Sequence, residues 1–185
     1  MTTTTKLMTA DELLRMPDDN QRHELVRGEL RTMPPSGYEH GGIVVNITGP
    51  LHQFVRSKKL GKVFGAETGF VLERSPDTVL APDVSYVSKL RLSEARSKKG
   101  FFPGPPDLAV EVMSPSDTIK HTEQKAKDWV EGGTALVWVV DPKRETVTVY
   151  EEGAEPVVVG IDDELDGGEI LEGFTLPVRE IFAED

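Results

Sequence analysis

The sequence contains no cysteine. This absence excludes a disulfide scaffold, a cysteine nucleophile and any metal site built from thiolates, and it is typical of a reducing compartment. The chain also lacks a run of about 18 apolar residues, the length that a membrane-spanning helix needs. Its first residues, MTTTTKLMTADELL, contain no apolar core of a secretion signal. We therefore expect a cytoplasmic protein that does not enter a membrane.

The composition is that of an ordinary globular domain. Of the 185 residues, 37% are hydrophobic and 29% are charged, which suits a chain with a buried core rather than a disordered or fibrous one. We expect a single domain over residues 1–185, with a flexible N-terminus at 1–8 and an acidic, strand-rich extension at 145–185.

Charge is distributed unevenly along the chain. The formal net charge is -11, but residues 1–144 carry 20 basic and 19 acidic groups, whereas residues 145–185 carry one basic and 13 acidic groups. Nucleic-acid binding usually needs a basic face, and most of the chain is nearly neutral. The charge therefore does not exclude DNA. It predicts weak, salt-sensitive binding with the acidic extension turned away from the duplex. Two basic runs, at 56–62 and 89–99, are interpreted as solvated surface.

The first half of the chain predicts helices and strands in alternation. Thr9 and Glu12 form a capping box, so a short helix should run from there to about Met16. Alternating residues around an Arg27-Gly28 turn predict a hairpin. Helical spacing from Tyr38 to Lys58 predicts a longer helix in which Gly49-Pro50 marks either a kink or a new start. Strands should follow within 62–74 and at 84–87.

The second half contains two strongly apolar strands. Residues 94–106 read as a loop rich in glycine, proline and lysine, and 107–113 as a buried strand. The next helix should have Ser116 or Asp117 as its N-cap and end near Glu131. The remaining expected elements are strands at 135–141, 145–153 and 155–161 and a short helix at 176–182. The order predicts an α/β (α+β) fold in which helices flank one mixed, curved β-sheet.

Two carboxylates lie where charge is costly, because Glu111 interrupts an apolar strand and Asp83 opens another. Carboxylates that converge form a hard, oxygen-rich site suited to Mg²⁺ or Mn²⁺. Lys125, on the helix after the Glu111 strand, could stabilise charge on a phosphate beside them. The alternative is structural: Glu111 would lie at the rim of the sheet or form a salt bridge with a lysine, and Asp83 would form a turn after Pro82.

A set of motifs in register resembles the Uma-two family, within the PD-(D/E)XK nuclease superfamily. The matching segments lie in order between about Glu24 and Pro142: HELVRGEL at 23–30, YEHGGIVVNI at 38–47, APDVSYV at 81–87, PDLAVEVMSPSD at 106–117, KAKDWVEGG at 125–133 and VWVVDP at 137–142. The resemblance implies a restriction-endonuclease-like core, with the site at one edge of the sheet.

The resemblance also implies roles for individual residues. The Pro-Asp of the superfamily corresponds to Pro82-Asp83, and its second acid to Glu111. The superfamily lysine would stand at Met113, but in this family the following helix carries it, as Lys125 four residues before Trp129. Residues four apart share a helix face, so Trp129 would pack below Lys125, while Lys127 points elsewhere.

Two further residues, Glu24 and His40, are implied as members of the site. Judged from the residues alone, Glu24 could be solvent-facing and His40 a cap at the start of its helix; Glu29 has the same character as Glu24 and ranks below it. Where the family often has an aspartate four residues before the lysine, this chain has His121, a departure that puts the placement of Lys125 in doubt.

The implied reaction is hydrolysis of DNA phosphodiester bonds by water activated on Mg²⁺ or Mn²⁺, with Asp83, Glu111 and the carbonyl of Val112 as metal ligands. Lys125 would either help to deprotonate that water or neutralise the phosphate. The alternatives are a non-catalytic binding or regulatory protein that keeps the fold, and a hydrolase for a small phosphorylated substrate. A homodimer would suit cleavage of both strands.

Two aromatic residues between Asp83 and Glu111 have a separate interpretation. Phe101 and Phe102 either stack on a nucleic acid or anchor their loop to the core. Anchoring is the commoner role of phenylalanine.

Overall fold

A computed structural model describes residues 7–95, 99–115 and 117–184. Its centre is a mixed six-stranded sheet, in which β8 and β9 are parallel and the other neighbours antiparallel. The order across this sheet is β11 (Val157–Val159), β10 (Thr146–Glu151), β9 (Leu136–Asp141), β8 (Leu108–Val112), β6 (Val84–Ser88) and β3 (Gly61–Gly65). All five residues of β8 are buried, because the central strands are covered on both faces.

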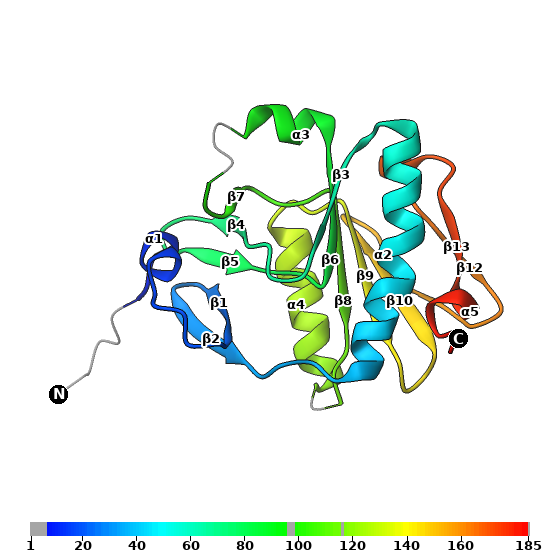
Figure 1. Ribbon diagram of the computed structural model, residues 1–185, viewed down its shortest axis with the longest axis horizontal. Coiled ribbons are helices and arrows are strands. Elements are labelled where there is room, and N and C mark those ends of the chain that lie inside the picture. Colours follow the sequence, from blue (N-terminus) through cyan, green and yellow to red (C-terminus); the bar gives the residue numbers. More distant parts are fainter. Residues whose placement is uncertain (1–6, 96–98, 116, 185) are drawn as a thin grey trace.

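A second sheet lies beside the first (Figure 1). Its five strands are, in order, β2 (Glu29–Met33), β1 (Arg22–Val26), β5 (Thr78–Leu80), β4 (Phe70–Glu73) and β7 (Phe102–Pro103). The N-terminal hairpin, β1 and β2, forms around the predicted turn, where Arg27 and Gly28 both have positive φ. The short helix α1 (Ala10–Leu14) starts at the predicted capping box of Thr9 and Glu12 and packs on β1.

Two helices cover opposite faces of the six-stranded sheet. Helix α2 (Tyr38–Lys58) packs its buried face on one side, in one hydrophobic cluster with residues of β6, β8 and β9. Helix α4 (Ile119–Glu131) packs Ala126 and Trp129 on the other side, in a cluster shared with the five-stranded sheet. A short helix, α3 (Lys89–Glu94), follows β6.

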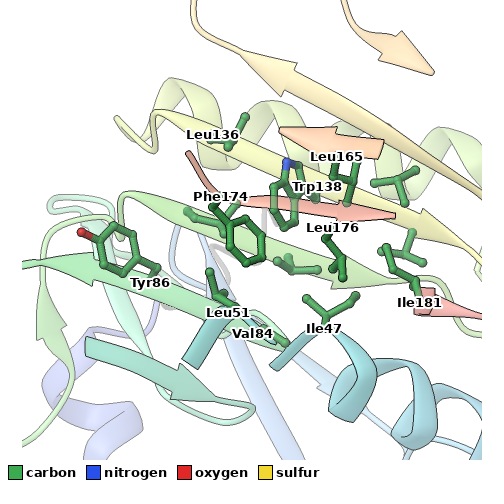
Figure 2. Close-up of a cluster of buried hydrophobic side chains, with 14 of the residues drawn as sticks. Ile47, Leu51, Val84, Tyr86, Leu136, Trp138, Leu165, Phe174, Leu176 and Ile181 are labelled. Atoms are coloured by element: carbon green, nitrogen blue, oxygen red, sulfur yellow. The ribbon is translucent and has the colours of Figure 1, made fainter. Parts of the chain in front are cut away.

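The acidic C-terminal segment contributes to the main core. It forms the small sheet β12 (Glu164–Asp166) and β13 (Thr175–Pro177), a 3₁₀ turn η1 (Glu169–Leu171) and helix α5 (Val178–Ile181). Figure 2 shows its buried residues Leu165, Phe174, Leu176 and Ile181 in one cluster with Ile47 and Leu51 of α2 and Trp138 of β9. Its charged side chains remain on the outside, so one segment combines strong acidity with apolar packing.

The predicted α/β fold class is confirmed, with two corrections, and the alternative left open at Pro50 is resolved. The described strands form three sheets rather than one mixed sheet, since chain order does not encode which strands pair. Asp117 is not the N-cap of α4: Thr118 accepts a hydrogen bond from the N–H of His121, while Asp117 accepts one from the N–H of Ser114. The alternative N-cap, Ser116, lies outside the described residues. Pro50 does not start a new helix, because it lies inside α2.

The structure bears on three smaller expectations. Phe101 and Phe102 anchor their loop, since Phe102 contacts Phe70 and Phe101 packs in the cluster around α1. Of the expected flexible N-terminus, residues 1–6 lie outside the described part, and the N–H of Met8 donates to the carbonyl of Gly28. Across the described residues, no helix has the length and apolar character that crossing a bilayer requires.

Candidate active site

The segment Ala81–Asp83 carries the chain from β5 in the smaller sheet into β6 in the larger one. The N–H of Asp83 donates to the carbonyl of Val110, 3.0 Å away. Because Val84 pairs with Val110 across these antiparallel strands, continuing the register places Asp83 opposite Glu111. Both carboxylates are buried, and they meet where the two sheets join.

Two side chains of the hairpin strand β1 form hydrogen bonds with this segment. The carboxylate of Glu24 accepts the N–H of Ala81 at 2.9 Å, and Nη2 of Arg22 donates to the carbonyl of the same residue at 2.8 Å. Arg22 and Glu24 are two residues apart, so they lie on one face of the strand. The two side chains hold Ala81 through the peptide units before and after it, and so position Asp83, which follows Pro82.

Among the carboxylates of the site, Asp83 accepts the most hydrogen bonds. Its Oδ1 accepts a hydrogen bond from Nη1 of Arg22 at 3.2 Å, and its Oδ2 accepts one from Nε2 of His40 at 3.1 Å and one from the N–H of Val112 at 2.8 Å. Burial acts to raise the pKa of Asp83, but the bonds from His40 and Val112 outweigh it and lower that pKa. The bond to Asp83 in turn raises the pKa of His40.

Glu111 and Lys125 form the second half of the site. Nζ of Lys125 lies 2.9 Å from Oε2 of Glu111 and 3.1 Å from Oε1 of Glu24. The indole N–H of Trp129 donates to Oε1 of Glu111 at 2.7 Å. Lys125 and Trp129 are one helical turn apart, as expected, and both reach the same carboxylate. Trp129 therefore contributes a hydrogen bond as well as packing.

Burial and charge set the pKa values of this pair. Burial raises the pKa of Glu111 to about 7, with Lys125 lowering it and the charges of Asp83 and Glu24 raising it further. Burial acts to lower the pKa of Lys125, but the carboxylates of Glu111 and Glu24 outweigh it and raise that pKa above its usual range. Lys125 is therefore an ammonium cation at neutral pH.

We expect Glu111 to titrate near neutrality in the metal-free protein. The indole resonance of Trp129 should report this in ¹⁵N–¹H spectra, because its N–H donates to Glu111, with a midpoint roughly between pH 6 and 8. The indole of Trp138 is the internal control, because its buried Nε1 has no hydrogen-bond partner among the described residues. A Trp129 resonance that stays constant over this range would contradict the raised pKa.

These residues lie at one cleft with a volume of about 530 Å³. Its lining includes all five predicted site residues, namely Glu24, His40, Asp83, Glu111 and Lys125, together with Val112. Arg31 and His121 lie at 3.4 Å from each other along it. Within the described part of the acidic extension, residues 145–184, no residue lines the cleft, so the acidic segment lies elsewhere, as expected.

The structure separates the alternatives left open for individual residues. His40 is not a helix cap, because Gly37 occupies that position. Glu24 is buried in the site, whereas Glu29 and Lys127 are exposed. His121 contacts Arg31 and leaves Lys125 between its two carboxylates.

Arg22 is the residue that the sequence analysis missed. It carries the hydrogen bond to Oδ1 of Asp83 and lines the cleft. The signal that could have found it is its position two residues before Glu24, on the same face of a strand. A lone arginine before a histidine has no other distinguishing context in the sequence.

The oxygen atoms that could coordinate a metal in this site suit a hard divalent ion. The available ligands are carboxylate and carbonyl oxygens, and a carboxylate offers about four acceptor positions. Counted over the bonds given above, Oδ1 of Asp83 and both oxygens of Glu111 each have one position in use, so they retain capacity for a further ligand. Among the described residues, however, no group of three or more His, Asp or Glu side chains is already arranged around a metal position. Asp83, Glu111 and the carbonyl of Val112 are the residues that would hold an ion.

A family model described as "Uma2: Putative restriction endonuclease" matches residues 10–179. The chain belongs to the Uma2 family. The solved structure of a putative nuclease of DUF820 from Anabaena variabilis is similar in fold, with a TM-score of 0.81 and 22% identity over 95% of this chain and 97% of that one. No curated protein sequence matches. The expected family and the restriction-endonuclease-like fold are thus confirmed.

If this Uma2 protein nicks DNA, as we propose below, Arg22→Lys should lower kcat/KM for nicking by about 10- to 100-fold with little loss of stability. Lysine keeps the charge, but its single ammonium cannot donate in a fork to both Ala81 and Asp83. Steady-state nicking and thermal melting would measure the two effects. Arg144→Lys is the matched control, since the solvent-exposed side chain of Arg144 pairs with Asp141 and does not line the cleft. An Arg22→Lys enzyme with wild-type kcat/KM would show that Arg22 does not position Asp83.

Proposed function

We propose that this protein is a divalent-ion-dependent endonuclease that hydrolyses phosphodiester bonds of DNA. The observation that carries the proposal is the placement of Asp83 opposite Glu111 across two paired strands, with Lys125 between Glu111 and Glu24. This arrangement lies in an open cleft. Membership of a restriction endonuclease family supports the reaction class.

Each residue of the site has a distinct part in this proposal. Asp83, Glu111 and the Val112 carbonyl would hold Mg²⁺ or Mn²⁺, which when bound supplies Lewis-acid stabilisation and a more acidic water. Lys125 is proposed to neutralise charge on the phosphate rather than to remove a proton, because two carboxylates hold its ammonium. Arg22 and His40 orient Asp83 through separate oxygens.

The electrostatics fit weak, salt-sensitive DNA binding. Arg31 and His121 add donors along the cleft, while the described acidic extension does not line it. Because phosphate contacts release counterions, affinity should fall steeply with salt concentration. We also propose a homodimer, which would place one site on each strand of a duplex.

Plasmid nicking by the purified protein tests the proposal. We expect supercoiled plasmid to be nicked in Mg²⁺ or Mn²⁺ and to stay intact in EDTA or with an Asp83→Asn variant. Equal nicking by the variant, or none by the wild type in either metal, would remove the catalytic proposal. DNA binding without nicking would then favour a non-catalytic binding protein, and failure to bind DNA even at low salt would favour a small phosphorylated substrate.

A further inference from the structure

A second cavity adjoins the cleft on the other side of Asp83. Its volume is about 730 Å³, within the range of ligand-binding cavities. Five residues line both spaces, namely Arg22, Pro35, Ser36, His40 and Asp83. The wall between the cleft and the second cavity is therefore built from the Asp83 cluster itself.

The second cavity differs from the cleft in its chemistry. Half-buried apolar side chains line part of it, including Met16, Val44 and Phe101. Exposed carboxylates, including Asp18 and Glu67, line another part. Lys125, Arg31 and His121 line only the cleft. Carboxylates and apolar side chains line both spaces, but Arg31 and Lys125 line only the cleft, and Arg22 is the single arginine or lysine in the described lining of the second cavity.

This difference in lining indicates which part of a nucleotide, the phosphate or the base, each space would bind. A phosphate in the second cavity would meet its carboxylates without the offsetting charges of Arg31 and Lys125. A base offers an apolar ring and, in adenine, guanine and cytosine, an amino group that donates to a carboxylate. A phosphodiester held beside Asp83 has a nucleoside on each side of it. One of these would extend along the cleft and the other would face the second cavity.

We propose that the second cavity binds the nucleobase next to the scissile phosphate, with preference for bases that carry an exocyclic amino group. This inference rests on the proposed nuclease function. It assigns a substrate-recognition role to residues of the α1–β1 loop and the start of α2, outside the catalytic cluster. Phe101 is an aromatic member of this lining, and stacking of a base on an aromatic ring changes binding severalfold to a hundredfold.

Helix α2 provides a matched pair of variants that separates filling of the cavity from damage to the fold. Gly41 lines the second cavity and Gly42 lines neither space. A Cβ at either position meets no atom within 4 Å, and leucine is a better helix former than glycine. Gly41→Leu should therefore obstruct the cavity, and Gly42→Leu should leave it open, with both proteins fully folded.

Methyl NMR of the full-length protein tests base binding without catalysis. We expect dAMP, dGMP and dCMP to shift the methyl resonances of Met16 and Val44 more than dTMP does, and inorganic phosphate to leave them in place. The shifts should disappear in Gly41→Leu and persist in Gly42→Leu. No shift with any nucleotide, an equal shift with inorganic phosphate, or shifts unchanged in Gly41→Leu would overturn the inference.

Nicking kinetics distinguish this inference from the proposed function. We expect Gly41→Leu to raise KM for DNA about tenfold with kcat nearly unchanged, and Gly42→Leu to match the wild type. If wild-type nicking depends on Asp83 and Gly41→Leu nicks with wild-type KM, the base-binding inference fails alone. If the wild type does not nick at all, the proposed function fails, and the inference of a base next to a scissile phosphate fails with it.

Discussion

An Asp83→Asn variant is expected to lose DNA nicking by on the order of a thousandfold while retaining the fold. The substitution keeps the size of the side chain and removes the negative charge that a hard divalent ion requires. Both oxygens of Asp83 accept hydrogen bonds, from Arg22, His40 and Val112. Asparagine has a single acceptor oxygen, so part of this set is also lost, and a modest drop in melting temperature should accompany the loss of activity.

The matched control is Asp162→Asn. Asp162 is exposed and pairs with Arg179 on the C-terminal segment, so removing its charge should leave nicking and melting unchanged. Circular dichroism would establish that both variants are folded. An Asp83→Asn protein that nicks at the wild-type rate would show that the Asp83 carboxylate has no role in the reaction.

A Lys125→Met variant should be destabilised by about 3–5 kcal/mol and should also lose nicking. Its ammonium lies between the buried carboxylates of Glu24 and Glu111. Methionine fills the space but leaves those two charges without a shared counterion. Because the pKa of Lys125 is raised, its ammonium contributes stability below the ordinary lysine value of 10.5, and the ion pair with Glu111 persists until that carboxylate takes up a proton near its pKa of about 7. Urea unfolding at neutral pH would measure the difference.

The loss in Lys125→Met should depend on pH with a definite sign. Without the ammonium, the folded pKa of Glu111 should rise above its wild-type value of about 7. The native state then binds more protons than the unfolded state, so stability falls as pH rises from the ordinary glutamate value of 4.5 through the raised one. The difference from wild type should therefore be larger at pH 8 than at pH 5, roughly the two ends of this window.

Lys127→Met provides the control on the same helix, because Lys127 is exposed. Its stability and nicking should match those of the wild type at each pH. A Lys125→Met protein as stable as Lys127→Met would mean that the two carboxylates need no counterion, which would remove the electrostatic account of the site.

The predicted helices and strands depended on local signals. The structure contains three elements that local signals predicted, from the capping box at Thr9, the Arg27-Gly28 turn and the continuous apolar run of β8. Each of these signals consists of a few adjacent residues. Elements with weak local signals were not predicted. Strand β7 is two residues long and pairs with β4, which lies far before it in the chain. Strand β5 is three residues long and pairs with its neighbour β4 and with β1, which lies far before it in the chain.

The site was predictable to the extent that charge in an apolar strand is unusual. Glu111 and Asp83 stood out for that reason, and Lys125 and Trp129 followed from helical spacing and family resemblance. Arg22 did not stand out, because its importance comes from the carbonyl of Ala81 and the carboxylate of Asp83, far along the chain. The role of Trp129 as a donor to Glu111 was likewise hidden by its apolar packing.

The sequence by itself determined the fold class, the family and the identity of the principal acidic and basic residues, because these depend on residue type and spacing over short stretches. Only the tertiary structure decided how the strands divide between sheets, that Glu24 and His40 are buried beside Asp83, and that a second cavity lies behind the Asp83 cluster. The physical reason is that pairing between strands and burial of charge depend on contacts between residues far apart in the chain. Because the chain has no cysteine, no thiolate can bind a metal in the candidate site. The candidate metal ligands are two carboxylates and a backbone carbonyl, and the fold brings the residues that carry them to one cleft.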